Sequence, residues 1–213
     1  MPDAETSSPA LPVAPEATPA RKRPKPGERR VQILEALATM LEQPGSERIT
    51  TAALAARLDV SEAALYRHFA SKAQMFEGLI EFIEQSVFSL VNQIGEREAA
   101  GNAQAAKIVA MLLQFAEKNP GMTRVMVGDA LVFENERLQQ RMNQFFDKIE
   151  STLKQSLRQI AEGSGSQTPT VDAQAQASAL TAFAIGRLQR FARSGFKKSP
   201  TEHLDVALRL FAA

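Results

Sequence analysis

The side chains best suited to chemistry in this chain lie between Thr50 and Lys72, and the chemistry they suit is hydrogen bonding to DNA. Ala63, Tyr66 and Arg67 fall on one face of a short predicted helix. A small residue, a hydrogen-bonding ring and a guanidinium on one face can contact base edges in the major groove. These three residues are therefore predicted to recognise a DNA sequence.

Hydroxyl and cationic side chains at predicted helix starts surround this face. Thr50, Thr51 and Ser61 are of types that cap helix N-termini, and Lys72 lies in the first turn of the following helix. Ser61 is included among the predicted DNA-binding residues. We expect Thr50, Thr51 and Lys72 to contact phosphates, so that their loss weakens binding to every sequence alike. His68 is predicted nearer the core, where it either packs or faces a phosphate.

Two short helices must position these side chains. The first is predicted to start at Thr50–Thr51, and the second to run from Ser61 to Phe69. Leu65 and Phe69 are four residues apart, so both point into a core. The gap between the helices, Leu58-Asp59-Val60, is too short for anything other than a helix-turn-helix.

Residues 49–76 resemble the DNA-binding domain of TetR-type regulators through the pattern T-x-x-x-L-A-x-x-x-x-V-S-x-x-x-L-Y-x-H-F-x-S-K. Ser71 and Gln74 add a capping box that starts the next helix. Asp59 departs from the pattern, since many family members have glycine there, but aspartate tolerates the left-handed conformation better than most residues. The resemblance implies an all-α fold in which an N-terminal helix-turn-helix domain precedes a helical dimerisation domain.

The composition excludes several other classes of protein. Apolar residues make up 44% and charged residues 23%, which is ordinary for a soluble protein. The longest apolar run, 108–113, is too short to cross a bilayer, and no signal peptide is evident, so a cytoplasmic location is expected. Cysteine is absent, and His68 and His203 are far apart and outside any catalytic motif. We expect no enzyme, cofactor or metal site.

Positive charge is concentrated near the predicted helix-turn-helix. Residues 21–72 hold ten Lys/Arg against six Asp/Glu, whereas residues 73–213 hold fifteen of each. Such clustering is the electrostatic footprint of a DNA-binding module. Residues 1–27 contain seven of the eleven prolines and are expected to be disordered. The basic run Arg21 to Arg30 is either a solubilising tail or an arm that follows DNA phosphates or enters the minor groove.

Every segment after this leader has helical period. About nine helices are expected, at 28–43, the two of the helix-turn-helix, 71–98, 103–118, 123–133, 136–162, 171–193 and 201–211. The predicted buried stripe of the first comprises Leu34, Leu37, Ala38 and Leu41. The helix over 136–162 fits either a coiled coil or an amphipathic bundle helix. We divide the chain into a leader (1–27), a DNA-binding domain (28–75) and a dimerisation and partner-binding domain (76–213).

Small residues line adjoining turns of the helix over 171–193, namely Ala175, Ala179, Ala182 and Gly186. They fit either internal packing or, as the TetR resemblance implies, a homodimer interface built from the last two helices. A dimer is also what DNA requires, because one helix-turn-helix covers a single half-site.

Phe82 lies off the apolar stripe of the helix over 71–98, so it is either covered by a neighbouring helix or part of a partner surface. Met111, Gln114 and Lys118 align along the next helix, and would form an apolar and basic groove with Phe82 if the two helices are neighbours.

The blocks SERITTAALAARLDVSEAALYRHFASKAQMFEGLIEFIE and EKNPGMTRVMVGDALVFENERLQQRMNQFFDKIE resemble the nucleoid-occlusion branch of the TetR family. That resemblance implies a homodimer on palindromic double-stranded DNA, more than one dimer per site, and antagonism of the tubulin-like division protein FtsZ. Its implied partner-binding residues are Phe82, Leu90, Met111, Gln114, Lys118 and Asn119, although arginine is common at the place of Leu90. The alternative is a ligand-responsive TetR-type repressor.

Overall fold

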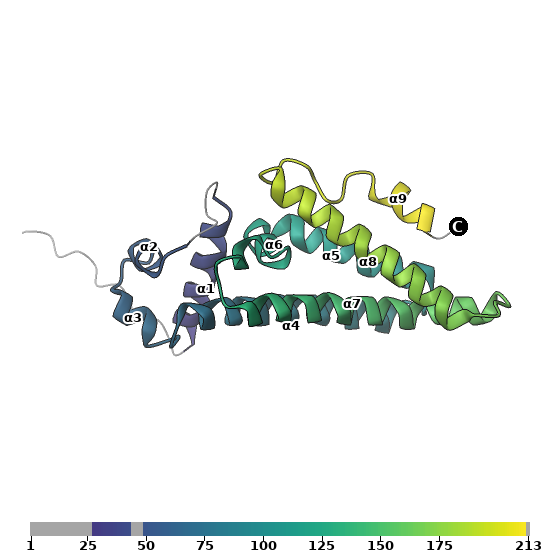
Figure 1. Ribbon diagram of the computed structural model, residues 1–213, viewed down its shortest axis with the longest axis horizontal. Coiled ribbons are helices and arrows are strands. Elements are labelled where there is room, and N and C mark those ends of the chain that lie inside the picture. The colour runs from purple at the N-terminus through teal and green to yellow at the C-terminus, as the bar shows by residue number, and fades with distance from the viewer. Residues whose placement is uncertain (1–26, 44–48, 212–213) are drawn as a thin grey trace, which may run out of the picture.

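The computed structural model describes residues 27–43 and 49–211 of the chain. Over these two ranges all regular structure is helical, as predicted, with nine α-helices and one short 3₁₀ helix (Figure 1). The predicted leader up to residue 26, with most of the basic run, lies outside these ranges. The elements are α1 Glu28–Leu41, α2 Thr51–Arg57, α3 Glu62–Tyr66, α4 Lys72–Arg97, α5 Asn102–Lys118, α6 Pro120–Met126, η1 Asp129–Leu131, α7 Glu136–Gly163, α8 Pro169–Arg193 and α9 Leu204–Phe211.

Helices α1, α2 and α3 form a head in which Thr50 and Ser61 are caps as predicted, whereas Thr51 is the first residue of α2. Thr50 and Ser61 accept hydrogen bonds, at 3.1 and 3.3 Å, from the N–H groups three residues later. Ser71 does the same at 3.2 Å and starts α4. Asp59 has a φ of 54°, the left-handed conformation expected in the turn between α2 and α3. Local side-chain chemistry thus sets where each helix of the head begins.

The predicted end of the second short helix was wrong, because α3 stops at Tyr66 and not at Phe69. Residues 67–70 instead turn the chain so that α4 can start at Ser71. Leu65 and Phe69 are both buried as predicted, since the Phe69 N–H still donates to the Leu65 carbonyl at 3.1 Å.

Two other boundaries and one stripe also differ from the predictions. Ile33 belongs to the buried stripe of α1, whereas Leu34 is half-buried at its edge, beside Gly78 of α4. α6 begins earlier than predicted because Pro120 suits the first turn of a helix. The same helix ends before Gly128, whose φ of 85° breaks the segment that was predicted to continue to residue 133.

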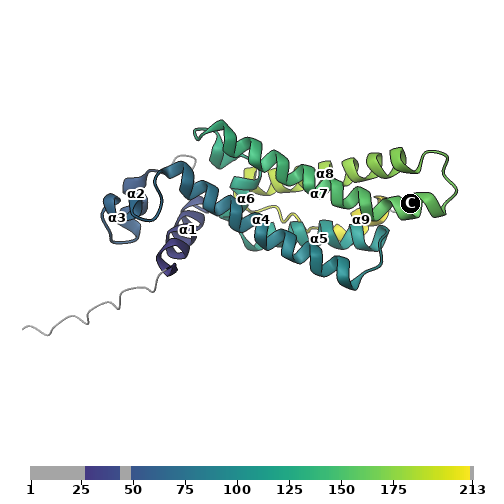
Figure 2. The same ribbon diagram turned by 90° about the horizontal axis from the view of Figure 1, so that it is seen from below.

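The long helix α4 joins the head to a helical body. Figure 2 shows α4 and α7 both starting at the head end and running in the same direction. Arg141 of α7 donates two hydrogen bonds to Glu84 of α4, at 3.2 and 2.6 Å, and Arg137 pairs with Glu77 at 2.5 Å. The Glu84 carboxylate also raises the pKa of the Arg141 guanidinium. These ion pairs join α7 to the first half of α4.

Helix α6 packs against α1 at a position where only glycine fits. A Cβ at Gly121 would lie 1.9 Å from the Ala38 carbonyl oxygen. The contact attaches the head to the body at a second place besides α4. Helix α7 packs on α4, α5 and α8. Of the two alternatives predicted for it, α7 is therefore an amphipathic bundle helix within the chain. In the described part of the chain, we find no helix with the length and apolarity needed to span a bilayer.

Candidate nucleic-acid interface and partner surface

The face predicted to meet DNA is exposed on α3. Ala63, Tyr66 and Arg67 are all solvent-exposed, and 45% of the Tyr66 surface is accessible. Helix α3 lies at the outer end of the head, away from the body (Figure 1). The opposite side of α3 buries Leu65. The structure therefore leaves these three side chains free for an outside partner.

Thr51 and Tyr66 are joined by a hydrogen-bond relay that ends on Glu62. The Thr51 hydroxyl donates to the Glu62 carboxylate at 2.5 Å, and the Tyr66 hydroxyl donates to the Thr51 oxygen at 3.5 Å. Glu62 is missing from the sequence predictions. An acidic residue in a first helical turn reads simply as a favourable dipole contact, so the sequence alone holds little signal for its link to Thr51.

His68 is exposed, so the prediction that it might pack in the core was wrong. The physical reason is the early end of α3, which places His68 in a turn. Its backbone carbonyl accepts a hydrogen bond from Arg30 at 2.5 Å, and the Arg30 guanidinium lies 4.1 Å from the centre of the Phe69 ring. Arg30, the last cation of the basic run, thus holds α1 against the end of the recognition segment.

Lys72 is already paired within the protein. Its ammonium contacts the carboxylate of Glu134, which lies just before α7, and sits 5.7 Å from the centre of the Phe76 ring. The Glu134 side chain is only 10% exposed. A DNA phosphate would therefore have to compete with Glu134 for Lys72.

Replacing Glu134 with glutamine is expected to tighten binding to DNA of any sequence about two- to fivefold, because the Lys72 ammonium is then free for a phosphate. The slope of log K against log salt should steepen by up to about one unit. Anisotropy titrations at several salt concentrations measure both quantities. Glu162→Gln is the control, since it removes the carboxylate of an ion pair at the far end of α7. An unchanged slope for Glu134→Gln would show that Lys72 does not reach DNA.

The predicted partner surface is only partly open. Helices α4 and α5 are neighbours, as the predicted groove requires. Phe82 is 46% exposed and Leu90 is 37% exposed, and Gln114 and Lys118 are also solvent-exposed. Met111 is half-buried against the core.

Two other side chains of this region serve the fold. Asn119 caps the end of α5, because its amide donates to the Phe115 carbonyl at 2.7 Å. Phe88, also on α4, packs edge-on against Phe145 of α7 with ring centres 5.6 Å apart. A neighbouring helix therefore covers Phe88 but leaves Phe82 exposed.

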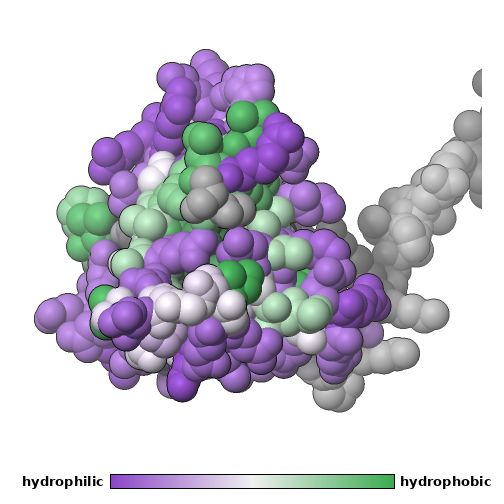
Figure 3. Space-filling view, turned by 90° about the vertical axis from the view of Figure 1, so that its right-hand side faces the viewer, coloured by the Kyte–Doolittle hydropathy of each residue, from purple (hydrophilic) through white to green (hydrophobic). Residues whose placement is uncertain are grey.

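The small residues predicted at a dimer interface form an exposed face of α8. Ala175, Ala179, Ala182 and Gly186 are all accessible, and a Cβ at Gly186 would meet nothing within 4 Å. On α9, Val206 and Leu210 also point outward, Leu210 with 78% of its surface accessible. Figure 3 shows apolar side chains gathered on the upper part of the molecule's end, where α9 lies in Figure 1. The described chain therefore leaves small and apolar surface uncovered along its last two helices.

Two family models match the chain. The model described as bacterial regulatory proteins of the tetR family matches residues 33–79, and a tetracyclin repressor-like, C-terminal domain of SlmA-like type matches residues 102–213. Nucleoid occlusion factor SlmA of Idiomarina loihiensis is 52% identical over 178 residues, 84% of this chain and 90% of the relative. The SlmA of Escherichia coli O81 is 50% identical over 197 residues, 91% of this chain and 98% of the relative. The chain belongs to the SlmA family within the TetR-type regulators.

Solved structures agree with the SlmA-family chain in fold. The fatty acid degradation regulator FadR of Bacillus halodurans matches with a TM-score of 0.72 at 13% identity, over 89% of this chain and 97% of that one. FadR of Bacillus subtilis, solved with stearoyl-CoA, matches with a TM-score of 0.69 at 13% identity, over 86% and 97%. At such low identity the likeness shows only that the fold is TetR-like.

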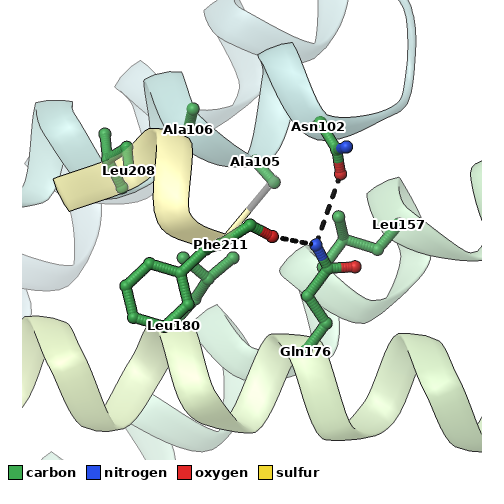
Figure 4. Close-up of a pocket in the computed structure, with 8 residues that line it drawn as sticks. All are labelled: Asn102, Ala105, Ala106, Leu157, Gln176, Leu180, Leu208 and Phe211. Carbon is green, nitrogen blue, oxygen red and sulfur yellow. Dashed lines mark hydrogen bonds between the residues drawn. The ribbon is translucent and has the colours of Figure 1, made fainter. Parts of the chain in front are cut away.

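Cavities in the SlmA-family body differ in size and lining. Figure 4 shows one between α5, α8 and α9, where Gln176 donates to the Phe211 carbonyl at 2.5 Å and to the Asn102 side chain at 3.5 Å. Its volume of about 10 Å³ suits a single water. A hollow of about 460 Å³ lies between α4, α5 and α7, and polar side chains such as Gln104, Ser156 and Gln159 line much of it.

Proposed function

We propose that this protein is a nucleoid occlusion factor. Bound to palindromic DNA as a homodimer, with more than one dimer on each site, it antagonises FtsZ polymerisation and prevents septum formation over the chromosome. Its place is on the nucleoid, in the cytoplasm. The name of the relatives and their identity of 50–52% support the proposal.

The exposed face of α3 supports the DNA-binding part of this proposal. An arginine, a tyrosine and an alanine stand free on a short helix whose start is capped. The last two helices leave small and apolar residues uncovered, as a chain that pairs with a second copy would. A two-fold dimer presents two such faces to a palindrome.

The exposure of Phe82 is the main support for the FtsZ-binding part of the proposal. Nearly half of this large aromatic side chain is accessible in the middle of α4, although α5 and α7 both pack on that helix. Leu90 extends the apolar surface along α4, and Lys118 adds a cation at the end of α5. An apolar surface with a basic edge fits a partner segment that combines apolar and acidic residues.

The alternative function is a repressor released by a small ligand. The hollow between α4, α5 and α7 has a volume in the range of ligand sites. Ligand sites in proteins are lined mainly by apolar and aromatic side chains, whereas none of the described residues that line this hollow is aromatic and four of them carry amides. The exposed Phe82 surface therefore supports FtsZ antagonism more strongly than the hollow supports ligand release.

Sedimentation of FtsZ polymers with GTP tests the proposal. We expect the protein with its specific DNA to reduce the pelleted FtsZ, and Phe82→Ala or Lys118→Asp to abolish this effect without loss of DNA binding. Truncation of a buried phenylalanine would instead cost about 3–5 kcal/mol and lower the melting temperature. A thermal melt of Phe82→Ala therefore distinguishes an interface residue from a core residue.

Phe133→Ala is the matched control, because Phe133 is 68% exposed but lies before α7 and outside the α4–α5 surface. It should leave FtsZ inhibition unchanged. If Phe82→Ala melts early, or still disperses FtsZ polymers while folded, the partner surface lies elsewhere. If the unaltered protein never affects FtsZ, the repressor function takes precedence.

A further inference from the structure

The relay from Tyr66 through Thr51 to Glu62 has a fixed direction. A carboxylate can only accept hydrogen bonds, so the Thr51 hydroxyl must use its one hydrogen on Glu62, at 2.5 Å. The Thr51 oxygen can then only accept, and the Tyr66 hydroxyl donates to it at 3.5 Å. While this bond is made, Tyr66 has no donor for an outside group.

We propose that Glu62 is a positioning residue that makes the Tyr66 hydroxyl a hydrogen-bond acceptor towards DNA. In the major groove, amino groups that donate are carried by adenine and cytosine, whereas guanine presents two acceptors. Tyr66 therefore selects adenine or cytosine over guanine or thymine on the strand that it faces. This inference rests on the proposed DNA binding and adds the residue that sets its specificity.

The same relay argues against a phosphate role for the two hydroxyls. Phosphate oxygens accept hydrogen bonds and need donors. The Thr51 and Tyr66 hydroxyls both donate to other side chains of the protein, and the exposed Glu62 carboxylate repels phosphates. Glu62 thus weakens contact with the DNA backbone while it orients the side chain that reads a base. Glu62 therefore increases the discrimination between bases at the expense of overall affinity for DNA.

A set of duplexes, each with one base pair of the half-site changed, tests the inference. Tyr66→Phe removes the hydroxyl and should relax discrimination at one position by about tenfold. Glu62→Ala should alter discrimination at that same position by a similar factor, because the Thr51 hydroxyl loses its acceptor and can then donate to the Tyr66 oxygen, which frees the Tyr66 hydrogen. Thr51→Val, which interrupts the relay, should do the same.

Glu35→Gln is the matched control, since Glu35 is an exposed carboxylate of the head on α1. Loss of this negative charge should raise the affinity for all duplexes by the same factor and leave the base preference unchanged. Melting temperatures establish that each variant is folded.

The inference is overturned if Glu62→Ala keeps the original preference at the position that Tyr66→Phe relaxes. It is overturned equally if Tyr66→Phe alters no position, since the hydroxyl then reads no base. Failure of the unaltered protein to prefer any duplex would instead contradict the proposed function, so the two failures are distinguishable.

Discussion

Replacing Gly121 with alanine is expected to lower the melting temperature by about 6–12 °C, from a loss of roughly 3 kcal/mol. The added Cβ would lie 1.9 Å from the Ala38 carbonyl oxygen and 2.8 Å from its carbon. Backbone atoms cannot rotate away as a flexible side chain does, so α6 and α1 must separate. A thermal melt followed by circular dichroism measures the loss.

Gly95→Ala is the control for this substitution. Gly95 also lies inside a helix, α4, but a Cβ there would meet only the Gln104 amide nitrogen, at 4.0 Å. Alanine favours a helix over glycine by about 1 kcal/mol, so this variant should melt at the same temperature or higher. Equal melting of both variants would contradict a close packing of α6 on α1.

Ala182→Arg is expected to abolish the dimer while the monomer stays folded. Ala182 is exposed in the middle of the small-residue face of α8, so an arginine there has room in the monomer but none between two closely packed copies. Without the second head, affinity for a palindromic site should fall by at least about 100-fold. Sedimentation velocity measures the dimer, and an operator titration measures the affinity.

Ala103→Arg places the same side chain on an exposed position of α5, outside this face. This control should remain dimeric and bind the operator normally. A dimeric Ala182→Arg protein would show that two copies associate through another surface, and the exposed apolar residues of α9 would then need a different explanation.

Local features of the fold were predictable from sequence because their causes are local. The caps Thr50, Ser61 and Ser71 were predicted from residue type, and each makes the expected bond to a neighbouring N–H group. The left-handed Asp59 followed from turn chemistry. Helical periodicity likewise predicted the off-stripe position of Phe82, and its exposure excludes the alternative that a neighbouring helix covers it.

Features that depend on distant residues could not be read from the sequence. The partner of Lys72 is Glu134, 62 positions away, and the sequence gives no sign that the two meet. The end of α3 was predicted too late because Phe69 fits helical spacing, yet the turn into α4 needs the same residues. The roles of the DNA-facing and FtsZ-facing residues stay predictions, since only binding measurements test them.

The pairing of α4 with α7 also fixes the distance between the head and α8. Arg141 holds Glu84 with two hydrogen bonds, and a slide of α7 by one turn, about 5.4 Å, would bring Phe145 to that carboxylate instead. The contact of Phe145 with Phe88 would be lost in the same step. The two helices therefore resist sliding and act as a rigid rod between the head and α8. In a dimer joined through α8 and α9, the α4–α7 pair of each copy would keep the two heads at a constant distance from each other. The spacing of the half-sites would then be dictated by the protein and not by the DNA.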